Sequence, residues 1–162
     1  MKILFIIGCA LISVLGVVPN NTWAGEIDSL VCFKSQRTLI LFSNGVEFKK
    51  YKVSLGKHPK GPKEKEKDEK TPEGKYIIND KAEGSNTKFH KNLGINYPNA
   101  ADKAQNRTGG DIKVHGLGPK YAKWGKLHRL RDWTDGCIAV TNHEIDEIYS
   151  LVKINTSIHI YP

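Results

Sequence analysis

Cysteine is scarce in this sequence. It has three cysteines, and one of them, Cys9, lies in an apolar N-terminal stretch. The other two, Cys32 and Cys137, could form at most one disulfide in an oxidising compartment. Zinc sites usually show closely spaced Cys and His ligands. The candidate zinc ligands in this sequence do not show that spacing; they are His115, His128, Cys137 and His143. We therefore expect no metal and no other cofactor.

Long apolar runs are also rare. The run Ile3–Val18 follows Met1-Lys2 and is too short to span a bilayer as a helix. With a basic start, an apolar centre and a small-residue site ending at Ala24, it is typical of a secretory signal peptide. We expect cleavage after about Ala24, so that Cys9 is discarded. Residues 25–162 then form one domain, without internal repeats and without a membrane span.

Acidic residues are outnumbered by basic ones, which gives a formal net charge of +8. The charge falls to +7 without residues 1–24, since that segment contains one lysine and no acid. A basic protein of this kind suits nucleic acid, an anionic membrane surface or an anionic cell wall. Export to the periplasm or cell wall argues against nucleic acid. The charge is compatible with the carboxylate-bearing stem peptides of peptidoglycan, but it does not single them out.

Short runs rich in β-branched and aromatic residues predict a mainly β domain. Asn44-Gly45 is typical of a tight hairpin turn. The expected strands are Ser29–Lys34, Arg37–Ser43, Val46–Ser54, Lys75–Asn79, Ile112–His115 and Thr156–Tyr161. The charged stretch Lys57–Lys70 and the polar stretch Asp80–Gly110 are expected to be loops, the second lying around a cleft.

One clear helix is expected after residue 140. Thr141 and Glu144 have the spacing of a capping box. Four apolar residues then follow with helical spacing and should face the core, namely Ile145, Ile148, Leu151 and Val152.

The most informative segment is Asp132–Val140, in which Cys137 directly follows Gly136. A cysteine in a strand is often a small buried hydrophobe, and we expect this for Cys32. The Asp-Gly turn before Cys137 favours instead an exposed thiol. A thiol together with a histidine from elsewhere in the chain is the minimum equipment for acyl transfer. His115, at the end of a short strand, is the candidate partner, although a lone histidine there could also be structural.

The chain resembles the L,D-transpeptidase catalytic-domain family, enzymes that remodel bacterial peptidoglycan through a catalytic cysteine. The order and spacing of seven segments carry the resemblance: Lys34–Leu39, Tyr51–Gly56, Lys70–Tyr76, Leu93–Asn99, Ile112–Gly116, Asp132–Val140 and Ile158–Pro162. The resemblance implies a β-sandwich or barrel-like domain. It also implies that Cys137 is the nucleophile and that His115 is its general base or ion-pair partner. The Gly116 backbone carbonyl would then orient the imidazole in place of a carboxylate.

Further site residues are expected around this pair. The backbone N–H groups of Gly136 and Cys137 are candidates for an oxyanion hole. Thr134 could line the turn or serve only to shape it. The remaining candidates for substrate contact are His90, Tyr97 and Arg131, the last because guanidinium suits a stem-peptide carboxylate. We expect His128 to be solvated in a basic loop.

Two positions depart from the commoner family pattern. Thr134 replaces a serine, and Ala139 stands where an arginine is usual, which resembles the branch with Asp-Trp-Thr-x-Gly-Cys-Ile-Ala. The expected activity is attack on the L,D-peptide bond of a tetrapeptide stem, release of D-alanine and transfer of the acyl group to an amine. Two alternatives stay open. One is a hydrolase of the same fold that trims stems or releases a wall-attached lipoprotein. The other is a non-catalytic wall-binding protein.

Overall fold

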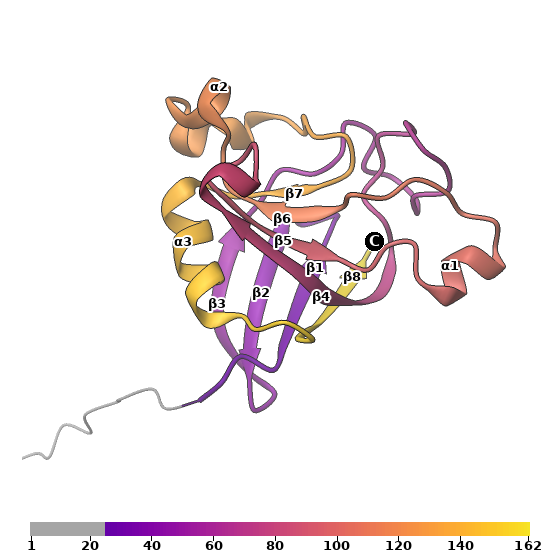
Figure 1. Cartoon of the computed structure of the whole chain (residues 1–162), viewed down its shortest axis with the longest axis horizontal. Helices are drawn as coiled ribbons and strands as arrows, with labels where there is room; N and C mark the ends of the chain where they lie inside the picture. Colours follow the sequence, from indigo (N-terminus) through magenta and orange to yellow (C-terminus); the bar gives the residue numbers. More distant parts are fainter. Residues whose placement is uncertain (1–24) are drawn as a thin grey trace, which may run out of the picture.

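Eight strands form a continuous, curled sheet in the order β3-β2-β1-β8-β4-β5-β6-β7 (Figure 1). The computed structural model describes residues 25–162, so the predicted signal segment and Cys9 lie outside the described residues. The strands are β1 Ser29–Phe33, β2 Thr38–Ser43, β3 Val46–Lys52, β4 Gly74–Glu83, β5 Lys91–Ile95, β6 Lys113–His115, β7 Ile138–Ala139 and β8 Ser157–Tyr161. The helices are α1 Ala100–Ala104, α2 Pro119–Ala122 and α3 Asn142–Leu151, with 3₁₀-helices η1 Gly84–Asn86 and η2 Gly125–Leu130.

Strand β4 turns the sheet through a corner. Its first residues pair with β8, and the residues from Ile78 onward pair with β5, with an irregularity in register between Ile78 and Asp80. Such an irregularity bends a strand and increases its twist. Strand β1 is parallel to β8 and β6 is parallel to β7, whereas the other neighbours are antiparallel.

The two edges of the curled sheet meet at Ser54, in the chain that follows β3. The Ser54 N–H donates to the Ala139 carbonyl at 3.0 Å, and the Ala139 N–H donates to the Ser54 carbonyl at 2.8 Å. These bonds join the chain after β3 to β7, at the other edge of the sheet, and give the molecule its barrel-like form. The mainly β fold expected from the sequence is thereby confirmed.

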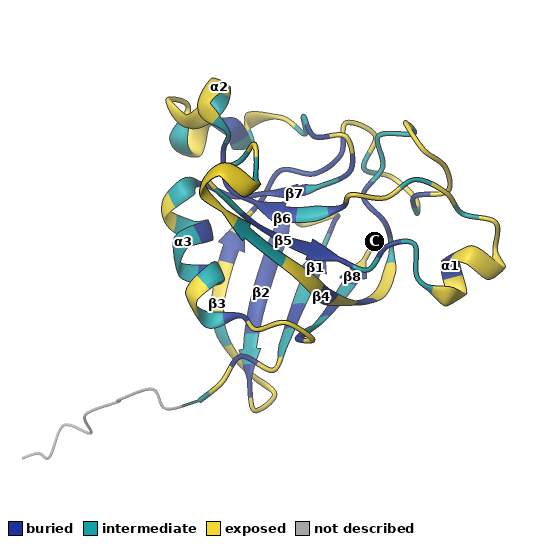
Figure 2. Ribbon diagram, in the orientation of Figure 1, coloured by how far each residue is buried: buried dark blue, intermediate teal, exposed yellow. Residues whose placement is uncertain are grey.

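The core fills the inside of the curl. Strand β1 alternates in burial, with Leu30 and Cys32 fully buried and their neighbours half-buried (Figure 2). Cys32 is therefore a small core residue, as the sequence predicts. Burial raises the pKa of its thiol to about 12, and both it and Cys137 are free thiols.

Helix α3 begins where the capping box predicts. The Thr141 hydroxyl accepts from the Glu144 N–H, and the Glu144 carboxylate accepts from the Thr141 N–H at 3.0 Å. Ile145 and Ile148 are fully buried against the sheet. Val152 is also buried, directly after the helix, and Leu151 is only half-buried.

Two stretches expected to be loops contain regular structure. Residues 80–110 include the end of β4, the strand β5 and the helix α1. Residues 119–131, which include the basic loop expected around His128, contain the short helices α2 and η2. Strand β5 escaped prediction because it is buried on both faces except at its start and therefore lacks the alternation of a half-exposed strand. In residues 25–162 no helix is both long and apolar enough to cross a bilayer.

Candidate active site

A tight turn from Thr134 to Cys137 presents the thiol. Gly136 has φ +128°, and a Cβ there would lie 2.7 Å from the Lys70 carbonyl oxygen, so only glycine fits. The Thr134 hydroxyl donates to the Cys137 carbonyl at 2.7 Å and accepts from the Gly136 N–H at 3.2 Å. Thr134 therefore shapes this turn, and it also lines the cavity beside it.

His115 is fixed at the end of β6. Its backbone pairs with Asn92 of β5 and Ala139 of β7. Its Nδ1 lies 2.6 Å from the Gly116 carbonyl oxygen, the contact that the family resemblance implies. Since a carbonyl oxygen can only accept, Nδ1 carries the proton and Nε2 is left as the basic nitrogen.

Aromatic rings enclose this imidazole. The Phe89 ring stacks on it with centroids 3.7 Å apart, and Trp133 meets it edge-on at 5.9 Å. His115 is only 1% exposed. Burial lowers its pKa to about 4, against the opposing effect of the Gly116 hydrogen bond.

Gly116 also lets α3 approach the site. A Cβ at this position would lie 2.5 Å from Cγ2 of Ile145. The Asn142 side chain at the start of α3 accepts from the Leu117 N–H at 2.6 Å. The glycine after the histidine therefore serves packing as well as imidazole orientation.

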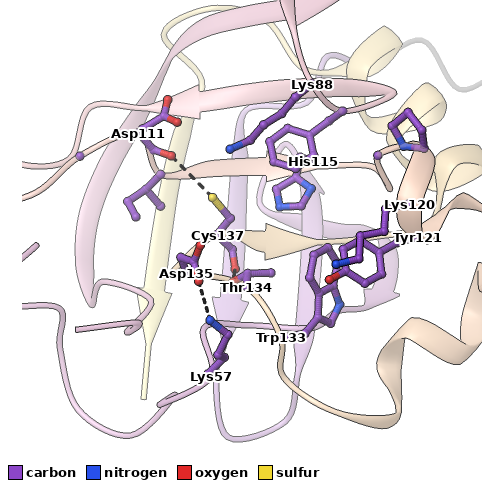
Figure 3. A pocket seen from close by; sticks show the side chains of 15 residues that line it. Lys57, Lys88, Asp111, His115, Lys120, Tyr121, Trp133, Thr134, Asp135 and Cys137 are labelled. Atoms are coloured by element: carbon purple, nitrogen blue, oxygen red, sulfur yellow. Dashed lines mark hydrogen bonds and ion pairs between the residues drawn. The ribbon is translucent and has the colours of Figure 1, made fainter. Parts of the chain in front are cut away.

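The half-buried Cys137 thiol points to Asp111 in the resting structure. Sγ lies 3.6 Å from the Asp111 carbonyl oxygen, and in Figure 3 the His115 ring lies on the other side of the sulfur. Burial raises the pKa of the thiol to about 11, although a hydrogen bond from the Lys113 backbone opposes the shift. With the pKa of His115 lowered, the resting pair is a neutral thiol and a neutral imidazole. This favours the general-base form of the prediction over a preformed ion pair.

Both side chains line one cavity of about 510 Å³. Three lysines reach it, and Lys57 is neutralised by Asp135 at 2.7 Å and by Glu69. Lys88 and Lys120 have no carboxylate partner in residues 25–162, and each ammonium lies 5.3 Å from the centroid of an aromatic ring. The cavity therefore combines a thiol, a basic nitrogen and two free positive charges.

These two lysines and the aromatic residues around them are missing from the sequence-based site. Lys88 and Phe89 directly precede His90 in the sequence, and they line the cavity whereas the predicted His90 does not. Trp133 and Tyr121 also line the cavity, lie next to each other in Figure 3 and pack with ring centroids 4.4 Å apart. Of these aromatic residues only Trp133 lies in the segment Asp132–Val140. Its position four residues before Cys137 is the one sequence feature that indicates a place in the site.

Three predicted substrate contacts lie elsewhere. Tyr97 is buried, with its hydroxyl 3.2 Å from the carbonyls of Lys63 and Thr108, and it supports the core. His90 lies outside the cavity and pairs with Asp146 of α3 at 2.9 Å.

Arg131 is exposed in a different groove, so a guanidinium does not enter the cavity.

His128 is buried, not solvated as the sequence suggested. It is 2% exposed, and its Nδ1 lies 3.1 Å from the Ser54 hydroxyl and accepts from Trp133 Nε1 at 3.4 Å. Burial lowers its pKa to about 4. The contact with Ser54 crosses 74 residues, which local patterning could not reveal. In the part of the chain that the structure describes, no cluster of His, Cys, Asp and Glu is suited to a metal ion.

Comparisons with known proteins show the family of the chain. A family model described as the L,D-transpeptidase catalytic domain matches residues 28–160. The Escherichia coli K12 protein YafK, whose own assignment as an L,D-transpeptidase is provisional, is 31% identical over 125 residues. The match covers 74% of this chain and 45% of YafK.

Solved structures share the fold. The helical cell shape determining protein Pgp2 from Campylobacter jejuni has a TM-score of 0.70 at 24% identity, over 85% of this chain and 48% of Pgp2. Bd1075 from Bdellovibrio bacteriovorus has a TM-score of 0.64 at 27% identity, over 87% of this chain and 50% of Bd1075. The chain thus spans about half the length of these relatives.

Proposed function

The chain belongs to the L,D-transpeptidase catalytic-domain family, and from this premise we propose that it is a cysteine acyltransferase acting on peptidoglycan stem peptides. One observation carries the proposal. The Cys137 thiol and the His115 imidazole, whose Nδ1 is fixed and whose Nε2 is basic, line the same cavity. A thiol and an unprotonated imidazole nitrogen in one cavity are the minimum requirements for acyl transfer.

The first step moves a proton. Sγ turns from the Asp111 carbonyl toward His115, and Nε2 takes the thiol proton while Sγ bonds to the carbonyl carbon of the L,D-peptide bond. The imidazolium then protonates the departing amine of D-alanine as the C–N bond breaks, which leaves a thioester on Cys137. The lowered pKa of His115 keeps it unprotonated at neutral pH and therefore able to act as the base.

The developing oxyanion needs backbone donors. We assign the Cys137 N–H as the first donor. The Gly136 N–H already donates to the Thr134 hydroxyl at 3.2 Å, so it joins only when that contact opens. Of the two backbone donors predicted from the sequence, only the Cys137 N–H is therefore assigned to the oxyanion hole in the resting state.

Lys88 and Lys120 take the role that the sequence gave to Arg131. Both ammonium groups reach the cavity without a carboxylate partner in residues 25–162. Stem peptides carry carboxylates, and a charge-assisted hydrogen bond is about twice as strong as a neutral one. These lysines would hold the substrate while the thiol attacks.

The acyl acceptor separates two candidate enzymes. The transferase delivers the acyl group to an amine, in our proposal the diaminopimelate side chain of a neighbouring stem, to give a cross-link. The second candidate is a hydrolase that uses water to trim stems or to release a wall-attached lipoprotein. It is favoured by Ala139, which is fully buried where the commoner family pattern has an arginine. A non-catalytic wall-binding role is disfavoured by the intact cysteine and histidine.

We also propose that the protein is exported to the periplasm or cell wall. Residues 1–24 would be the signal peptide, and residues 25–162 the mature catalytic domain. The sequence of the first segment supports this, together with the cell-wall substrates of the family. The proposed partners are therefore peptidoglycan stem peptides, with no nucleic acid.

The test is digestion of disaccharide-tetrapeptide by the purified mature chain, followed by mass spectrometry. A transferase yields a cross-linked dimer with loss of one D-alanine, and a hydrolase yields only the tripeptide monomer. Cys137→Ala should abolish both products while it keeps the circular dichroism spectrum. Turnover by a folded Cys137→Ala protein would refute the enzymatic proposal.

The lysine assignment has its own test. Lys88→Gln combined with Lys120→Gln should raise KM about tenfold and lower kcat less, because a ground-state contact is lost. Lys57→Gln is the matched control, since that ammonium is already paired within the same cavity. Amidation of the substrate carboxylates should remove the difference between the double variant and the wild type. An unchanged KM would overturn the assignment.

A further inference from the structure

Residues 119–131 project from the sheet at the end of the molecule that carries the cavity. In Figure 1 this projection, which contains α2 and η2, stands away from the strands, and in Figure 2 most of it is exposed. Pro119, Lys120 and Tyr121 contribute to the cavity wall. The projection therefore forms part of the rim of the proposed active site.

The projection exposes large apolar side chains. Trp124, Leu127 and Leu130 are 39%, 62% and 82% exposed. The Leu127 N–H donates to the Trp124 carbonyl at 2.9 Å, which holds this segment in a tight turn. These three exposed side chains, spaced three residues apart in and directly before η2, are called the apolar row below.

A buried histidine of η2 anchors this segment to the rest of the protein. His128 is buried and contacts the Ser54 hydroxyl and the Trp133 indole. This anchor fixes the rotation of η2 and keeps the row that starts at Trp124 turned toward solvent. The apolar row is therefore exposed because the contacts of His128 with Ser54 and Trp133 hold η2 in this orientation.

Positive charge flanks the apolar row. Lys123 and Lys126 are exposed, and no ion pair links either of them to an acid within residues 25–162. Arg129 pairs with Glu144 of α3. From residue 112 to residue 131 the sequence contains no Asp or Glu. Apolar and aromatic side chains beside unpaired lysines are typical of segments that lie in the interface of an anionic bilayer.

We propose that this surface, made by Trp124, Leu127 and Leu130 with Lys123 and Lys126, docks the protein on an anionic phospholipid membrane. The leucines enter the acyl boundary, the tryptophan lies at headgroup level, and the lysines face anionic headgroups. Docking places the rim of the cavity against the membrane surface. The proposal goes beyond the acyltransferase assignment and does not depend on it.

Co-sedimentation with lipid vesicles tests the surface. The mature chain should bind vesicles of phosphatidylglycerol mixed with phosphatidylcholine, and bind much more weakly to phosphatidylcholine alone or at high salt. Leu127→Ser combined with Leu130→Ser should weaken binding at least about tenfold. Lys123→Gln combined with Lys126→Gln should do the same, because each lysine near an anionic surface strengthens binding by about fivefold.

Matched variants keep the test specific. Val46→Ser with Ile154→Ser removes two exposed aliphatic residues away from the projection, and the hairpin that starts β3 lies at the opposite end of the molecule in Figure 1. Lys65→Gln with Lys67→Gln removes the same charge from an exposed loop. Both controls should bind vesicles like the wild type. Turnover of soluble disaccharide-tetrapeptide, measured in parallel, shows separately whether the enzyme assignment holds.

Four results would overturn the proposal. The first is absence of binding to anionic vesicles, and the second is an equal loss in the control variants. The third is a loss of binding to purified peptidoglycan sacculi with vesicle binding unchanged, which would make the surface a wall contact. The fourth is light scattering that shows a dimer which the double leucine variant converts to monomer, because the row would then join two copies of the chain.

Discussion

The neutral resting state of the thiol and imidazole predicts an unusual pH profile for alkylation of Cys137. Iodoacetamide reacts with the thiolate, so its rate follows the ionised fraction. Burial raises the pKa of Cys137 to about 11, which leaves about one thiol in ten thousand ionised at pH 7. Between about pH 6 and pH 9 the rate should rise about tenfold per pH unit without a plateau.

A preformed ion pair would behave in the opposite way. An imidazolium beside the sulfur would keep the thiolate populated, and the rate would be flat across neutral pH. At pH 7 the two cases differ by about four orders of magnitude in ionised fraction. The structure favours the first case, because burial also lowers the pKa of His115 to about 4.

The assay follows the added mass by intact-mass spectrometry and locates it by peptide mapping. Cys32 is the internal control, since it is fully buried and the pKa of its thiol is raised to about 12. A folded His115→Gln variant should keep the same steep profile, because no ion pair is lost. A flat rate between about pH 6 and pH 8 in the wild type would refute the reasoning and would mean that the thiol leaves Asp111 in solution.

Two further predictions concern stability. Gly136→Ala should cost about 2–4 kcal/mol in urea unfolding, because it forces a Cβ against the backbone at φ +128°; Gly45→Ala, at φ +73° with nothing within 4 Å, should cost only about 1–2 kcal/mol, and equal losses would contradict the role of the close contact. The pKa values of His115 and His128 are lowered to about 4, so below about pH 6.5 the unfolded chain binds more protons than the folded chain. Stability should therefore fall by about 2 kcal/mol per histidine between about pH 7 and pH 5, and an unfolding free energy that stays constant over this interval would show that these rings are solvated.

Local sequence patterns predicted much of the sheet. Strand β2 begins one residue after the expected start and ends at Ser43 as expected, and the Asn44-Gly45 turn follows it. Helix α3 begins directly after the predicted cap at Thr141. These elements are set by turn chemistry, capping and alternation, which act between residues close in sequence.

The features that escaped prediction depend on contacts between distant parts of the chain. His128 lies in a basic stretch whose composition is typical of a solvated loop, yet it is buried through Ser54 and Trp133. The Phe89 ring, from the segment before β5, stacks on His115 at the end of β6, and burial of the imidazole lowers its pKa. Neither the spacing nor the composition of the sequence carries information about that burial. The sequence could therefore predict which residues form the candidate site, but not the protonation state that burial gives them.

Ser54 connects the proposed active site to the projecting surface. Its backbone exchanges two hydrogen bonds with Ala139, in the strand that follows Cys137. Its hydroxyl contacts both the ring and the carbonyl of His128, which anchors η2. One residue at the closure of the sheet thus positions both the strand next to the nucleophile and the helix that carries the exposed apolar row.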